Sequence, residues 1–299
     1  LTWINRAEWL VEQMGARGIY CQINFFDTWA RHKDHWFEYT TSGGDHVFNV
    51  WASGDETAKE NYIRTLVARF GGYYNVYWEL GNEMEHSPND GSAFVSHANS
   101  YYLPWIRQYD PYGLPIGVSE SSIWGSTNVE VAFLHQTGSL PPSSGSDRVY
   151  IMNELVFGWS GGVLAYDPVM RNSANRLGYR RTFWRMFTYG GTGSSEATWL
   201  RIDTPLNSAA LTVMDDQNRL RALIEDLPVS INEMDVDTGF VSSGPGSYRT
   251  RRKHGECYVT YFLLDPGQST GAGKVTVSLP PGDYVVGWYD AKNGAYGSE

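Results

Sequence analysis

The chain has 299 residues, few cysteines and no long apolar run. No apolar run approaches the roughly 18 residues that a membrane-spanning helix needs, so we expect no membrane partner. The only cysteines, Cys21 and Cys257, each lie in an apolar, strand-like run, and they are far apart in sequence. We expect two buried free thiols rather than a disulfide. Cysteine and histidine show no metal-ligand spacing, so we expect neither a metal nor another cofactor.

Basic residues are outnumbered by acidic ones, and the formal net charge is −10. The phosphates of nucleic acids favour a basic surface, so this balance argues against a nucleic-acid partner. An acidic surface fits a neutral partner, although many proteins are acidic simply for solubility. The chain also lacks an Asn-x-Ser/Thr sequon, which leaves a bacterial source open.

Aromatic residues are abundant, with 12 Trp and 20 Tyr. Their faces stack well on sugar rings, but aromatic side chains also fill protein cores. The composition is therefore a mild indication of carbohydrate binding.

Two stretches share one pattern, an apolar strand that closes on Asn-Glu. Residues 75–85 (NVYWELGNEME) contain Asn82-Glu83, and residues 148–158 (RVYIMNELVFG) contain Asn153-Glu154. Each pattern indicates a strand that is buried on both faces. In a barrel of parallel strands the loops after the strands converge at one end and carry the chemistry. Glu83 and Glu154 are therefore the leading catalytic candidates.

Helical and strand patterns alternate over the first two thirds of the chain, which is typical of repeated βα units. Helices are predicted at residues 3–15, 55–70, 93–109 and 172–188, and strands begin near residues 18, 75, 115, 129, 148 and 195. A closed (β/α)8 TIM-type barrel has eight strands. We therefore expect such a barrel without its first two strands in this chain. Strands of a partner chain, as in a homo-oligomer, or a gap would take their place.

The pattern changes after residue 227. Alternating strands at residues 258–264, 274–279 and 284–290 are separated by Pro-Gly turns, which predicts a small antiparallel β-sandwich. We expect a catalytic barrel domain over residues 1–227 and a C-terminal β domain over residues 228–299.

The two strand-end glutamates fit the chemistry of retaining glycoside hydrolysis. That reaction uses two carboxyl groups about 5 Å apart, one as acid/base and one as nucleophile. If residues 195–200 form the eighth strand, Glu154 ends the seventh strand and Glu83 the fourth, and these face each other across a barrel.

The sequence resembles the clan A glycoside hydrolases, whose acid/base follows an Asn at the end of strand four and whose nucleophile ends strand seven. Within that clan it is most similar to the apiosidase-like (DUF4038-type) glycosidases, which carry a C-terminal β domain of the collagen-binding type. Residues 67–84, 180–193 and 284–294 carry this resemblance. Many of those relatives have Asp where this chain has Glu83, so the resemblance does not carry the substrate over.

The resemblance implies that Glu83 is the acid/base and Glu154 the nucleophile. Asn82 would bind the sugar 2-hydroxyl, and His135 would orient the nucleophile. Further expected substrate contacts lie at or beyond strand ends: Glu120, Trp29, Trp36, Trp124, Trp159 and Trp199. The substrate would be a polysaccharide or an oligosaccharide. We expect a secreted or periplasmic location for an enzyme that degrades polysaccharides, although this chain shows no signal peptide.

Several alternatives stay open. The Asn-Glu dipeptide also occurs at Asn232-Glu233, where no chemistry is expected, and Glu79 and Glu85 compete with Glu83. His135 and the named tryptophans could instead be packing residues. The same fold could also serve a uronic-acid polysaccharide lyase, which would need a basic pocket, or a non-catalytic carbohydrate-binding protein.

Overall fold

A computed structural model describes residues 2–27, 50–51, 54–85, 91–135, 141, 148–154, 173–193, 208–263 and 274–297. The chain forms two compact units. The first consists of Leu1–Phe133 with Asp147–Val149, and the second of Leu134–Ser146 with Tyr150–Glu299. The predicted boundary between the two domains, after residue 227, stays a prediction.

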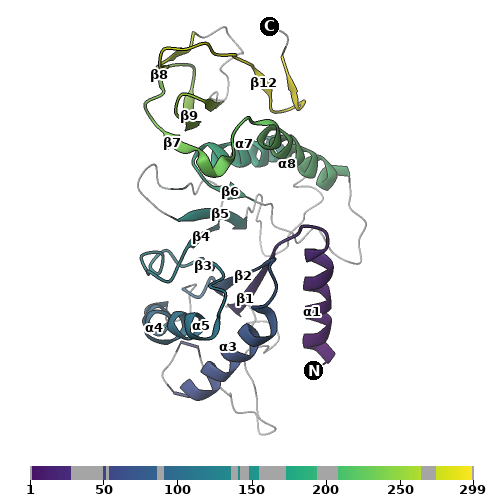
Figure 1. The fold of residues 1–299 in the computed structure, drawn as a ribbon, viewed down its shortest axis with the longest axis vertical. Coiled ribbons are helices and arrows are strands. Elements are labelled where there is room, and N and C mark those ends of the chain that lie inside the picture. The colour runs from purple at the N-terminus through teal and green to yellow at the C-terminus, as the bar shows by residue number, and fades with distance from the viewer. Residues whose placement is uncertain are drawn as a thin grey trace. The chain divides into compact units, whose positions relative to one another are not determined.

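A parallel sheet carries the strands that the Asn-Glu pattern predicted (Figure 1). Its order is β1-β2-β3-β4-β5-β6. The strands are β1 (Cys21–Asp27), β2 (Val76–Asn82), β3 (Ile116–Val118), β4 (Val131–His135), β5 (Val149–Glu154) and β6 (Thr192–Gly193). A spatial order that follows the chain order is that of a barrel, because a doubly wound sheet reverses its order at a switch point. The sheet with its helices confirms the α/β barrel fold class.

Aromatic side chains form the core of the first unit. Trp78 on β2 packs against Phe25 on β1, with ring centroids 5.3 Å apart, and Phe26 packs against Tyr102 at 5.0 Å. All four side chains are fully buried. The helices α1 (Thr2–Gly15) and α3 (Glu56–Phe70) add apolar residues to this core. Many of the aromatic side chains therefore belong to the hydrophobic core.

The helix predicted over residues 93–109 is a single helical run with an irregular middle. It begins at α4 (Gly91–His97), widens into a π-helix (Ala98–Tyr102) and ends with α5 (Leu103–Tyr109). Pro104 lies in the first turn of α5 and has no N–H to donate to the preceding turn. The wider π turn accommodates that missing bond.

The second unit contains α7 (Ser173–Thr188) and α8 (Ser208–Asp226). Strand β6 begins at Thr192, earlier than the predicted start at residue 195, and residues 194–200 lie outside the described residues. A Cβ atom on Gly193 would lie 3.2 Å from Cβ of Met152 on β5. Gly193 therefore belongs to the strand, where it permits close approach to β5.

Within the described residues, three small antiparallel sheets follow α8, in agreement with the predicted β region. They contain β7 (Asp235–Asp237), β8 (Val241–Ser243), β9 (Ser247–Lys253), β10 (Cys257–Leu263), β11 (Thr276–Val277), β12 (Tyr289–Asp290) and β13 (Ala295–Tyr296). The strand predicted over 284–290 is wrong except for its last two residues. Val285 is 98% exposed, and residues 284–288 pair with no other strand among the described residues.

Cys21 and Cys257 are free and buried, as predicted. Within the described part of the chain, no helix has the length and apolarity to cross a membrane.

Candidate active site

Strand β2 ends in a sharp turn that brings the chain back into the core. Gly81 makes this turn possible, because a Cβ atom at that position would lie 2.5 Å from Cγ of Met84. The Met84 side chain is fully buried beside the strand end. Asn82 and Glu83 therefore lie in a turn that is held in place by the buried side chain of Met84.

The backbone of Glu83 has a left-handed conformation, with φ = 54°. Among the described non-glycine residues, only Asp55 shares a positive φ. This conformation costs an ordinary residue about 1 kcal/mol or more, and such strain concentrates at functional sites. The geometry therefore separates Glu83 from the neighbouring glutamates as a candidate for chemistry.

Side chains that follow the adjacent strand β3 bind the backbone of this turn. The N–H of Glu83 donates to Oγ of Ser119 at 3.0 Å, and the N–H of Met84 donates to Oε1 of Glu120 at 2.5 Å. On the other side, Nε1 of Trp51 donates to the carbonyl of Met84 at 3.0 Å. The turn thus has fixed partners on both its donor and its acceptor groups.

Glu120 is a buried acid, with only 3% of its surface exposed. Burial raises the pKa of Glu120 to about 7, and the nearby Glu85 carboxylate adds to the rise. The hydrogen bonds from Met84 and Ser119 oppose this shift but are weaker than the burial effect. Its position favours support of the turn over direct contact with a sugar.

The remaining groups at this strand end are polar and aromatic. Asn82 is only half-buried, and its Oδ1 has no hydrogen-bond partner among the described residues, so it can accept a bond from a ligand hydroxyl. Glu85 accepts a short hydrogen bond from Ser122. Nε1 of Trp124 donates to the carbonyl of Val118 at 3.0 Å, which fixes the half-buried indole after β3. Asn82, Glu83, Glu120 and Trp124 are thus gathered at the ends of β2 and β3.

The other predicted site residues lie in the second unit or outside the described residues. His135 and Glu154 are the last residues of β4 and β5, as the sequence predicted. The side chain of Glu154 is not among those described. Four predicted sugar platforms fall outside the described residues: Trp29, Trp36, Trp159 and Trp199.

Glu79, a competitor of Glu83, and Glu233, in another Asn-Glu dipeptide, both form hydrogen bonds within the fold. Glu79 is buried within β2, and its Oε2 accepts a bond from Nε2 of Gln22 at 2.6 Å. Glu233 belongs to a capping box at the start of a short 3-10 helix, where its carboxylate accepts from the N–H of Ser230. The third Asn-Glu dipeptide, Asn232-Glu233, for which the sequence predicted no chemistry, thus has a capping role.

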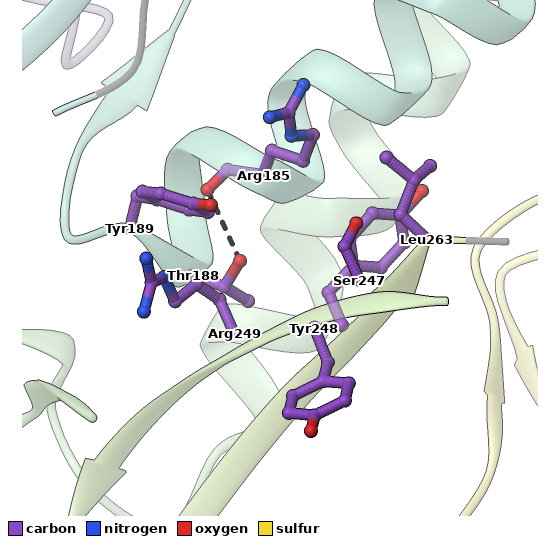
Figure 2. Close-up of a pocket in the computed structure, with 8 residues that line it drawn as sticks. Arg185, Thr188, Tyr189, Ser247, Tyr248, Arg249 and Leu263 are labelled. Atoms are coloured by element: carbon purple, nitrogen blue, oxygen red, sulfur yellow. Dashed lines mark hydrogen bonds between the residues drawn. The ribbon is translucent and has the colours of Figure 1, made fainter. Parts of the chain in front are cut away.

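A small pocket in the second unit offers different chemistry. It lies between α7 and the strands β9 and β10 (Figure 2). Its lining residues are Arg185, Thr188, Tyr189, Ser247, Tyr248, Arg249, Tyr261 and Leu263. None of these described lining residues carries a carboxyl group. The guanidinium of Arg249 stacks on Tyr189 at 4.7 Å, and Arg185 points away from Arg249. The described residues that line this pocket therefore do not supply the pair of carboxyl groups that glycoside hydrolysis uses.

Sequence reasoning missed three residues that shape the candidate site. Ser119 and Trp51 bind the turn after β2, and Met84 anchors it. The available signal was the Ser-Glu pair directly after a buried strand. Within the described residues, no group of three His, Cys, Asp or Glu side chains could hold a metal ion.

Comparison with protein families gives one match. The model of the cellulases, glycosyl hydrolase family 5, matches residues 1–237. A comparison with curated proteins finds no match.

Solved structures with a similar fold include a glycoside hydrolase family 5 from Bacteroides vulgatus ATCC 8482. It has 13% sequence identity and a TM-score of 0.55, over 83% of this chain and 59% of that one. A candidate glycoside hydrolase from the same bacterium has 15% identity and a TM-score of 0.54, over 85% of this chain and 48% of that one. The chain therefore spans about half to three fifths of these proteins, and the likeness at this identity concerns the fold alone.

Proposed function

Since the chain belongs to glycosyl hydrolase family 5, the cellulase family within clan A, we propose that it is a retaining glycoside hydrolase. It cleaves O-glycosidic bonds of a polysaccharide or an oligosaccharide. Glu83 is the acid/base and Glu154 is the nucleophile.

The observation that carries this proposal is the left-handed backbone of Glu83 at the end of a barrel strand. A strained residue persists only where its surroundings hold it, and here Ser119 binds its N–H directly. Asn82 precedes it with an unpartnered buried oxygen. The strand-end position of Glu154 supports the second role.

In the first step the protonated Glu83 gives its proton to the departing glycosidic oxygen while a Glu154 oxygen attacks the anomeric carbon. The old C–O bond breaks, and a glycosyl ester forms on Glu154. In the second step Glu83 removes a proton from water, which displaces Glu154 and releases the sugar. Two inversions at one carbon retain its configuration. Asn82 contacts the 2-hydroxyl, and that contact strengthens in the transition state.

We also propose the narrower assignment to the apiosidase-like subtype, with a C-terminal β domain of the collagen-binding type. It is supported by the similarity of residues 67–84, 180–193 and 284–294. Glu83 stands where many members of that subtype have Asp, which fits a cellulase-type substrate better. A substrate panel should therefore contain both β-glucans and pectic polysaccharides.

The test is release of reducing sugar from that panel by the parent, Glu83→Gln and Glu154→Gln. We expect each variant to lose roughly 10²-fold or more of the parent activity while it remains folded. Glu233→Gln is the matched control, because it alters the third Asn-Glu dipeptide, whose carboxylate caps a 3-10 helix. A parent that is silent on every substrate, or variants that match it, would contradict the proposal.

The stereochemistry has a separate test. Proton NMR recorded directly after hydrolysis should show the product anomer with the configuration of the substrate. Azide added to the Ala variants should give the retained glycosyl azide for Glu83 and the inverted one for Glu154. An inverted first product would exclude the double displacement.

A further inference from the structure

We infer that Glu120 is a positioning residue for the acid/base: together with Ser119, it holds the backbone turn that carries Glu83. This inference rests on the proposed function, because it takes Glu83 to be the acid/base. It differs from the sequence prediction, in which Glu120 contacts the sugar.

The first step of the argument is the pairing of β2 with β3. Trp78 pairs with Ile116 and Glu79 with Gly117, in parallel register. Continuing this register places Ser119 and Glu120 beside the end of β2. The two residues thus lie beside the turn whose N–H groups need partners.

The second step is the pattern of hydrogen bonds. Ser119 Oγ accepts from the N–H of Glu83 and lies 3.0 Å from both the carbonyl of Gly81 and Oε1 of Glu120. Its single proton bonds one of these two acceptors. Oε1 of Glu120 accepts the next N–H along the chain, that of Met84. Consecutive N–H groups of the strained turn are therefore held by consecutive side chains.

The third step is the burial of Glu120. It is 3% exposed, and its Oε2 is buried without a partner among the described residues. A sugar cannot reach a carboxyl that is covered in this way and whose Oε1 binds the backbone. An unsatisfied buried oxygen also costs stability, so stability alone does not explain the residue. Glu120 therefore acts through the backbone of the turn.

Three variants distinguish positioning of the turn by Glu120 from a catalytic role of its carboxyl group and from a general effect on stability. Glu120→Ala removes the acceptor for the N–H of Met84, whereas Glu120→Gln keeps an oxygen in that place. Glu130→Ala is the matched control. Oε2 of Glu130 accepts the N–H of Ile116 at 2.9 Å, at the opposite end of β3. Glu130→Ala removes the same kind of bond at the end of β3 that lies away from Glu83, together with the ion pair between Glu130 and Arg107.

We expect Glu120→Ala to lower kcat by about 10- to 100-fold with little change in KM, because a misplaced acid weakens catalysis more than binding. Glu120→Gln should stay within about threefold of the parent, and Glu130→Ala should lose stability but keep kcat. A Glu120→Ala variant with parent kcat would overturn the inference. Equal losses in Gln and Ala would also overturn it, since they would indicate a catalytic carboxyl.

The dependence of kcat/KM on the leaving group provides a further test, because a purely structural role of Glu120 would not change it. A dinitrophenyl glycoside needs little proton donation, whereas an alkyl or sugar leaving group depends on it. Glu120→Ala should therefore lose kcat/KM mainly on the poor leaving groups. An equal loss on both substrates would contradict positioning of the acid.

Crystal structures of the variants test the inference without any measurement of activity. In Glu120→Ala the backbone of Glu83 should leave the left-handed region, whereas in Glu130→Ala it should keep it. If Glu83 keeps its positive φ without the Glu120 carboxyl, the inference fails even for an active enzyme. If the parent is inactive on every substrate, the proposed function fails, and these structures still decide the role of Glu120 in the turn.

Discussion

Nε1 of Trp78 donates a hydrogen bond to Oδ2 of Asp110 at 3.0 Å, and both side chains are buried. Asp110 also accepts the N–H groups of Tyr112 and Leu114, at 3.0 and 2.8 Å. One carboxylate thus joins strand β2 to the turn between α5 and β3. It fixes the two strands whose ends carry the candidate site.

Asp110→Ala should lower the free energy of unfolding by about 2–4 kcal/mol, because it leaves three N–H donors without their acceptor. Urea unfolding measures the change. Glu225→Ala is the control, since Glu225 forms an exposed pair with Arg221 that contributes about 0–1 kcal/mol. Equal effects of the two variants would show that the Asp110 network contributes little.

Gly117→Ala should also destabilise the barrel, because its Cβ would lie 2.3 Å from a ring carbon of Phe133 on β4. We expect a loss of about 1–3 kcal/mol from this overpacking. Gly72→Ala is matched in chemistry but meets no atom within 4 Å. Thermal unfolding of both variants checks the prediction, and a Gly117→Ala protein as stable as the parent would contradict it.

The sequence predicted the elements whose patterns are local. The residues of β2 alternate as in a buried strand and end in a short polar stretch. The structure places this strand over Val76–Asn82. Strand β9, SYRTRRK, was not predicted because its residues are mostly charged. Its stability comes from antiparallel pairing with β10 and β7, which no local pattern reveals. Tertiary pairing overrides local preference here.

The candidate site was likewise predictable from the sequence only where its signal is local. Glu83 followed from its place at a strand end. The left-handed backbone of Glu83 and its support by Ser119 and Glu120 depend on the neighbouring strand. The strand-end position of Glu120 predicts a sugar contact in the sequence, whereas the structure shows a buried carboxyl that accepts the N–H of Met84. Contacts between strands are the information that a single sequence lacks.

Asn82→Ala should lower kcat/KM by roughly 10²-fold, because the 2-hydroxyl contact contributes several kcal/mol in the transition state. Steady-state kinetics on a parent substrate and its 2-deoxy analogue provide the test. The variant should lose much less on the analogue, which lacks the hydroxyl that Asn82 would bind. The same loss on both substrates would assign Asn82 a different role.

The buried carboxyl of Glu120 should make stability depend on pH. Its pKa is about 7 in the folded protein, against an ordinary value of 4.5. Between these values the folded state holds a proton that the unfolded state has released, so stability falls as the pH rises through this window. The loss is roughly 3 kcal/mol and is complete above about pH 7.

Glu120→Gln cannot ionise and should escape this loss. Its unfolding free energy relative to the parent should therefore rise by roughly 2–3 kcal/mol between pH 5 and pH 8, as urea unfolding at both values would measure. Glu225→Gln, whose side chain is 61% exposed, should show no such change. A constant difference between Glu120→Gln and the parent would mean that Glu120 is ionised in the fold at pH 5. Burial would then be outweighed by the hydrogen bonds from Met84 and Ser119.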